Sequence, residues 1–149
     1  MAVMGVAKFE RFFRLAGDLD VDKNDLKRYG DFVNHKIYDL ILMGQDTAKW
    51  NGRDVIAASD LPITKGLQES IHDFRDIDEE IELRPILDDL AARPPLDLTL
   101  SEEAQGRLPL IAGGLSVALA RSFKIIDTKV KNPQTEHWQR AFRLFDLLL

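Results

Sequence analysis

Apolar residues recur at helical spacing over the first fifty residues, in a short segment followed by a long one. Residues 9–16 carry a stripe of phenylalanines that stops at Gly17, which predicts a short amphipathic helix. From about Lys23 to Lys49 an apolar residue returns at every helical turn, which predicts one long helix ending at Asn51-Gly52. A polar loop, residues 18–22, separates the two helices.

After the long helix the pattern changes twice. Val55-Ile56 is a short β-branched pair within a loop. Apolar positions from Ile63 to Phe74 then predict a third, shorter helix, and we expect the acidic residues 76–82 to form a connector. The first half of the chain therefore has the order short helix, loop, long helix, loop, short helix.

The same order begins again in the second half. An ungapped shift of 77 residues places apolar residues on apolar residues through both helices and loops. The pairs are Phe9 with Ile86, Phe13 with Leu90, Leu19 with Leu96, Val21 with Leu98, Val33 with Leu110, Leu40 with Val117, Ala48 with Ile125, Leu61 with Trp138, Leu67 with Leu144 and Ile71 with Leu148. Helical periodicity alone does not keep loops in phase, so we infer an internal repeat: unit 1 at 6–76 and unit 2 at 83–149.

The second long helix has its own features. Asp22 and Thr99 occupy equivalent positions, each with an acid three residues later, and this spacing predicts an N-cap at both. Pro109 predicts either a bend near 105–109 or a later helix start. Gly113-Gly114 either let the first long helix approach closely or simply weaken this one.

Neither unit can bury both faces of a long helix with its own short helices. We therefore expect a single all-α domain spanning residues 1–149. In it the two long helices cross, and the loops of one unit lie beside the loops of the other.

Composition limits the classes of function. The chain of 149 residues is 45% hydrophobic and 30% charged, contains no cysteine and has no long uninterrupted apolar run. We expect a cytoplasmic globular protein without disulfides, thiolate chemistry or a membrane span. Acids outnumber bases 25 to 20, and this balance disfavours binding to DNA through phosphate contacts.

The second loop of unit 1 carries a specific motif. It reads GRDVIAASDL over residues 52–61, and it fits the pattern G-R-x-[TV]-I-x-A-x-D-[IL]. With the short, long, short order of helices, this motif resembles the histone fold of archaeal histones. Two such units resemble a histone dimer fused head to tail, as in a small uncharacterised bacterial family. The resemblance implies a tandem pair of histone folds packed as an intrachain pseudodimer, with Arg53 and Asp60 forming a structural clamp.

The residues that would contact DNA differ from the family pattern. Archaeal histones carry Lys and Thr where this chain has Asp54, Val55 and Ala57, and unit 2 has Val130 and His137 at the shifted positions of the clamp. The remaining candidates for DNA contact are the basic residues Arg11, Arg14, Lys23, Lys27, Arg28 and Arg53. Several acids lie among them, so a solvated charged surface is the simpler interpretation.

Candidate catalytic and metal-binding residues are few. His35 lies one helical turn from Asp31 and Asp39, a spacing that suits a metal or a proton relay, but no second histidine supports it. His72 and His137 are isolated, and the sequence contains no phosphate-binding glycine loop or nucleophile elbow. We expect no catalytic residue, no metal and no cofactor, so the protein is not expected to be an enzyme.

The C-terminal segment is unusually apolar. It contains Phe142, Leu144, Phe145, Leu147, Leu148 and Leu149, which either belong to the core or form a docking surface for another chain. The sequence favours a non-enzymatic protein-interaction or scaffold module that binds another protein or itself. An architectural DNA-binding role like that of archaeal histones is the alternative.

Overall fold

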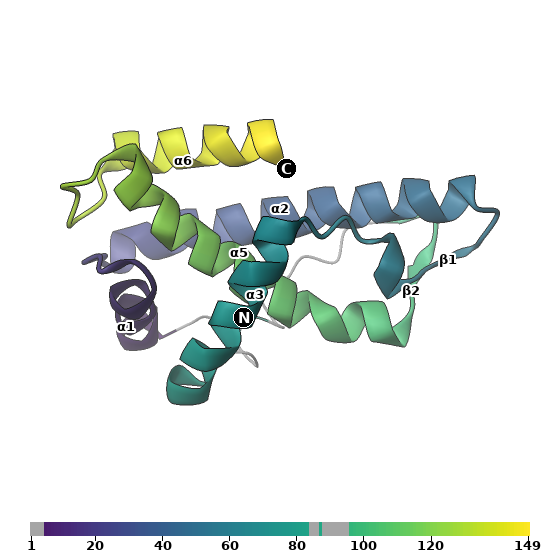
Figure 1. Cartoon of the computed structure of the whole chain (residues 1–149), viewed down its shortest axis with the longest axis horizontal. Coiled ribbons are helices and arrows are strands. Elements are labelled where there is room, and N and C mark those ends of the chain that lie inside the picture. The colour runs from purple at the N-terminus through teal and green to yellow at the C-terminus, as the bar shows by residue number, and fades with distance from the viewer. Residues whose placement is uncertain (1–4, 84–86, 88–95) are drawn as a thin grey trace.

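The computed structural model describes residues 5–83, 87 and 96–149, and it is mostly helical (Figure 1). In unit 1 the elements are α1 (Val6–Gly17), α2 (Lys23–Trp50), β1 (Val55–Ile56), a 3₁₀ turn (Ala58–Asp60) and α3 (Lys65–Ile81). In unit 2 they are β2 (Thr99–Leu100), α5 (Glu102–Ile126) and α6 (Thr135–Leu148). The expected apolar positions Ile86 and Leu90 at the start of unit 2 lie outside the described residues.

The predicted limits of the first long helix are confirmed, because α2 has the expected signals at both ends. At its start the Asp22 side chain accepts a hydrogen bond from the Asn24 N–H (2.9 Å), and the Asp22 N–H donates to the Asp25 carboxylate (3.2 Å). After the C-cap Asn51, Gly52 has a φ of 69°, which glycine adopts without steric cost.

The predicted connector at 76–82 is wrong. Helix α3 continues to Ile81, and Glu82 is its C-cap. The apolar stripe extends beyond Phe74, because Ile77 packs against the core and Ile81 is buried. Between them, Glu79 and Glu80 are exposed and form the solvent side of an amphipathic helix.

The predicted cap at Thr99 is also wrong. Thr99 belongs to β2, and Ser101 caps α5 by accepting a hydrogen bond from the Ala104 N–H (3.0 Å). A later start of this helix is excluded as well, because α5 runs from Glu102 through Pro109 without interruption. The carbonyl that proline leaves without a donor belongs to Gln105, which is an exposed residue.

The glycine pair of α5 faces α3 and not the first long helix. A Cβ atom on Gly113 would lie 2.4 Å from Phe74 Cδ2, and one on Gly114 would lie 2.4 Å from Ile71 Cγ1. Both distances are far below van der Waals contact. The glycines therefore permit the close crossing of α3 over α5 that Figure 1 shows.

The two long helices contact each other in the core, as predicted. Tyr29 of α2 and Ser116 of α5 are both buried, and their hydroxyl oxygens lie 2.7 Å apart. The Ser116 hydroxyl donates to the Ala112 carbonyl (2.7 Å), so Tyr29 is the donor in the bond to Ser116. Burial raises the pKa of Tyr29 far above its usual value, which keeps this hydroxyl protonated.

The loops of the two units lie side by side, and this part of the prediction is confirmed. At one end β1 pairs in parallel with β2, with Val55 opposite Thr99 and Ile56 opposite Leu100. At the other end the Asp20 N–H of unit 1 donates to the Lys131 carbonyl of unit 2 (2.7 Å). Each unit therefore contributes one loop to each end of the domain.

The units also share one core. The indole of Trp138 in α6 packs against Phe13 of α1 and Phe123 of α5, with ring centroids 6.1 and 4.9 Å apart. Further along the same face of α6, Phe142 and Phe145 pack against Phe32 of α2, and Phe142 also contacts Trp138. Helix α5 is long and apolar enough to cross a membrane by length and composition alone, but most of it is buried within the protein. Such burial is typical of the central helix of a globular domain.

Candidate functional site

The second loop of unit 1 holds Arg53 and Asp60 in a bidentate ion pair. The two terminal nitrogens of Arg53 donate to the Asp60 carboxylate oxygens at 2.5 and 2.6 Å, and the Ala57 N–H donates to Asp60 Oδ2 at 2.8 Å. The carboxylate is buried, whereas the Arg53 side chain is partly exposed. Hydrogen bonding from Arg53 lowers the pKa of Asp60. Asp60 takes up two of the five guanidinium N–H donors and neutralises its charge, which lowers the attraction of Arg53 for a phosphate.

Acid should weaken this loop. The pKa of Asp60 is lower in the folded than in the unfolded chain, so the ion pair stabilises the protein above a pH of about 4. Its contribution is lost as the pH falls through the folded-state pKa. When the pH is lowered from about 7 to about 3, the urea midpoint of the wild-type protein should fall by more than the urea midpoint of Asp60→Asn does.

The exposed Asp46 provides the control for this experiment, because Asp46→Asn removes a carboxylate outside the loop. Its midpoint should change with pH as the wild-type midpoint does. Equal changes in wild type and Asp60→Asn would show that the ion pair does not stabilise the fold.

The second loop of unit 2 contains a different side-chain pair, a hydrogen bond between His137 and Asp127, in the equivalent place. His137 occupies the position shifted from Asp60, and its Nε2 lies 3.1 Å from Asp127 Oδ2. The Gln134 N–H donates to His137 Nδ1 (2.9 Å), so the neutral ring carries its proton on Nε2 and donates it to Asp127. The expectation that His137 is isolated is therefore wrong. The signal that could have found the pair is the repeat itself, which aligns His137 with Asp60.

Most of the basic candidates for DNA contact have acidic partners. The pairs are Arg11 with Glu80 (3.8 Å), Arg14 with Asp20 (3.7 Å), Lys27 with Asp31 (2.8 Å), Arg28 with Asp25 (3.9 Å) and Arg53 with Asp60 (2.5 Å). Arg28 also donates to Thr135 Oγ1 at 2.7 Å. Within the described part of the chain, Lys23 is the one candidate without such a partner. The acids cancel much of the positive potential that a phosphate backbone requires.

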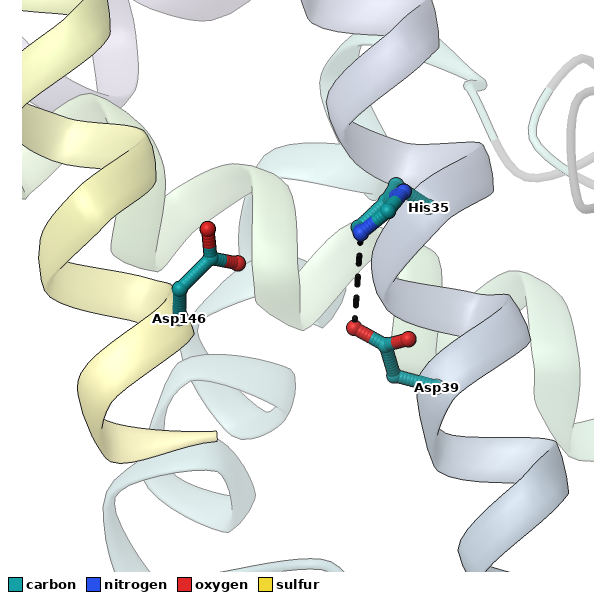
Figure 2. Close-up of side chains that lie close together, drawn as sticks. All are labelled: His35, Asp39 and Asp146. Atoms are coloured by element: carbon teal, nitrogen blue, oxygen red, sulfur yellow. Dashed lines mark ion pairs between the residues drawn. The ribbon is translucent and has the colours of Figure 1, made fainter.

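A second cluster forms where α6 lies against α2. Figure 2 shows His35 and Asp39 on α2 and Asp146 on α6, and one ligand-type atom of each lies within 4.8 Å of the others. His35 Nε2 is 3.8 Å from Asp39 Oδ2. Asp31, the other acid expected near His35, pairs with Lys27 instead. Sequence reasoning missed Asp146 because it lies on a helix far from His35 along the chain.

Lys36 supplies a cation to the same carboxylates. Its side chain is only 3% exposed, and Nζ lies 2.5 Å from Asp146 Oδ1 and 3.5 Å from Asp39 Oδ2. Hydrogen bonding from Lys36 lowers the pKa of Asp146. A divalent ion held by these oxygens would lie next to the buried ammonium group of Lys36, and the two positive charges would repel each other. The cluster is therefore better suited to linking α2 and α6 than to binding a metal.

A mainly apolar groove of about 650 Å³ lies between α3, α5 and α6, and we call it the α6 groove. Around it Ile125, Leu147 and Leu148 are 80%, 82% and 77% exposed. The C-terminal segment is thus divided. Phe142 and Phe145 pack against the core, while the last leucines of α6 face solvent.

Comparison with known proteins gives relatives along nearly the whole chain. A family model described as "Domain of unknown function (DUF1931)" matches residues 9–146. Two proteins of Aquifex aeolicus (strain VF5), both described as uncharacterized, are similar in sequence. One is 32% identical over 95% of this chain and 82% of its own length, and the other is 31% identical over 83% and 80%.

Two crystal structures are similar in fold. One is of a protein from Thermus thermophilus, with a TM-score of 0.87, 56% identity and 100% of both chains covered. The other is of AQ328 from Aquifex aeolicus, with a TM-score of 0.82, 27% identity, and 96% of this chain and 94% of that chain covered.

Proposed function

This chain belongs to the DUF1931 family, and we propose that it is a non-enzymatic protein-interaction module built from two histone folds in one chain. Three features support the architecture: the repeated order of elements, the contact of the long helices through Tyr29 and Ser116, and the pairing of loops at both ends. In this arrangement unit 2 takes the place of the second subunit of a histone dimer.

The observation that carries the interaction role is the exposed apolar surface around the α6 groove. Single exposed leucines are common on soluble proteins, whereas a contiguous apolar patch is typical of a protein contact surface. Here Ile125, Leu144, Leu147 and Leu148 lie on or beside one groove. A partner that covered them would remove much apolar area from water.

We propose that the partner is a second copy of the same chain. The patch contains a hollow, the α6 groove, and the side chain of Leu147 protrudes beside it. In a dimer with a twofold axis, Leu147 of each copy can therefore fill the α6 groove of the other copy. The charges along this part of α6 have both signs, with Glu136 next to Arg140 and Arg143. Because Glu136 already pairs with Arg140 within the chain, these charges carry no part of the association, which rests on the apolar contact.

Analytical ultracentrifugation tests this proposal. We expect the wild-type protein to sediment as a dimer at a concentration of about 50 μM and Leu147→Lys/Leu148→Lys to sediment as a monomer. Each buried leucine contributes about 1.5–3 kcal/mol, so losing both should weaken association at least about 100-fold. A wild-type protein that remains monomeric at this concentration would contradict self-association.

Leu15→Lys is the matched control. Leu15 is a partly exposed leucine on α1, and it does not line the α6 groove. This variant should sediment as the wild-type protein does. Circular dichroism should be unchanged in both variants, because the substituted side chains face solvent.

The DNA-binding alternative draws its support from the resemblance to archaeal histones and from the exposed Lys23. The acidic partners of the other five candidates and the net charge of −5 disfavour it.

A further inference from the structure

A cavity separate from the α6 groove lies between α3 and α5, next to the second loop of unit 1. We call it the α3–α5 cleft, and its volume is about 340 Å³. Its apolar lining includes Leu61 from the loop, Ile71 from α3 and Ile111 from α5. Two of its walls are fixed, because α3 crosses closely over α5 at Gly113 and Asp60 anchors the loop.

The polar side chains of the cleft are cationic or neutral. Gln68, His72 and Arg75 are spaced three and four residues apart, so they project from one face of α3, and Arg107 adds a second guanidinium from α5. No Asp or Glu is among the described residues that line the cleft, although acids outnumber bases in this chain. The cleft thus differs from the basic candidates for DNA contact, which lie among acids.

The two guanidinium groups are largely free to bind a ligand. Over residues 5–83, 87 and 96–149, Arg75 makes no ion pair, and Arg107 contacts only Glu103, at 3.0 Å between two exposed side chains. Such exposed pairs are weak, so a ligand can replace this contact at little cost. Arginine presents a planar fork of donors that matches a carboxylate.

We propose that the α3–α5 cleft binds a small organic anion with an apolar body, with Arg75 and Arg107 holding the carboxylate. The apolar lining accounts for the body of the ligand, and the guanidinium groups account for its charge. The volume lies at the lower end of the roughly 300–1,000 Å³ range of ligand pockets, which suits a short-chain carboxylate better than a nucleotide.

A titration with hexanoate, followed by amide chemical shifts in NMR spectra of the full chain, tests this site. Hexanoate should shift the backbone amide signals of 58–63, 68–75 and 107–111, except those of Pro62 and Pro109, which have no amide proton. Arg75→Gln and Arg107→Gln should each weaken binding about tenfold, the loss of one charge-assisted contact. Hexanol, which lacks the charge, and inorganic phosphate, which lacks the apolar body, should both bind more weakly than hexanoate.

Arg140→Gln is the matched control. Arg140 makes the same kind of pair with the acid four residues before it as Arg107 does, and both arginine side chains are 58% exposed. Its loss should leave hexanoate binding unchanged. The proposal is overturned if hexanoate at about 20 mM shifts no amide of the cleft, or if the two cleft variants bind it as tightly as the wild type.

Discussion

Trp138→Ala should lower the free energy of unfolding by about 3–5 kcal/mol, the usual cost of truncating a large buried aromatic side chain. Trp138 is 1% exposed and contacts Phe13 of unit 1 and Phe123 of unit 2. Its loss leaves a cavity where the units meet, so neither unit should retain its stability. Urea unfolding followed by circular dichroism measures the change.

Trp50 provides the control, because its side chain is 91% exposed at the end of α2. Trp50→Ala should change the free energy of unfolding by no more than about 0.5 kcal/mol. Wild type and Trp138→Ala should each unfold in a single transition, since the units share one core. Two separate transitions, with only the later one sensitive to Trp138, would contradict a shared core.

Gly113→Ala should lower the free energy of unfolding by about 1–3 kcal/mol, even though alanine is the better helix former. The added Cβ would lie 2.4–2.5 Å from three atoms of the Phe74 ring, and that ring is fully buried. Relieving the overlap requires α3 to move away from α5, which opens a closely packed helix contact. Thermal and urea unfolding both measure this loss.

Gly106→Ala in the same helix should have the opposite effect. Gly106 is exposed, and an added Cβ there meets nothing within 4 Å. Alanine should therefore stabilise α5 by about 0.5–1 kcal/mol through its higher helix propensity. Stabilisation by both substitutions would show that α3 and α5 do not pack as closely as described.

Sequence periodicity predicted the features of the fold that depend on residues close together in the sequence. The limits of α2 follow from an apolar stripe, a capping box at Asp22 and a glycine after the last turn, all of which are local signals. The predicted end of α3 was too early because the charged residues 76–82 were interpreted as a loop, although Ile77 and Ile81 continue the apolar stripe. The predicted cap at Thr99 failed because Thr99 is drawn into a strand by its pairing with β1, and Ser101 caps α5 instead.

Other features depend on segments that are distant in sequence. No periodicity could show that Gly113 faces Phe74, or that Lys36 and Asp146 join two helices of different units. The same is true of the α3–α5 cleft, whose two arginines lie on helices of different units. The Arg53 and Asp60 spacing, in contrast, was visible because both lie in one short loop.

Titration of a random-sequence DNA duplex over a salt series, followed by fluorescence anisotropy, most directly tests the proposed role as a protein-interaction module rather than a DNA-binding protein. We expect no saturable binding even at about 50 mM salt, because the candidate cations are largely paired with acids. Saturable binding with an affinity that falls steeply as salt rises would contradict this role and support an architectural DNA-binding protein.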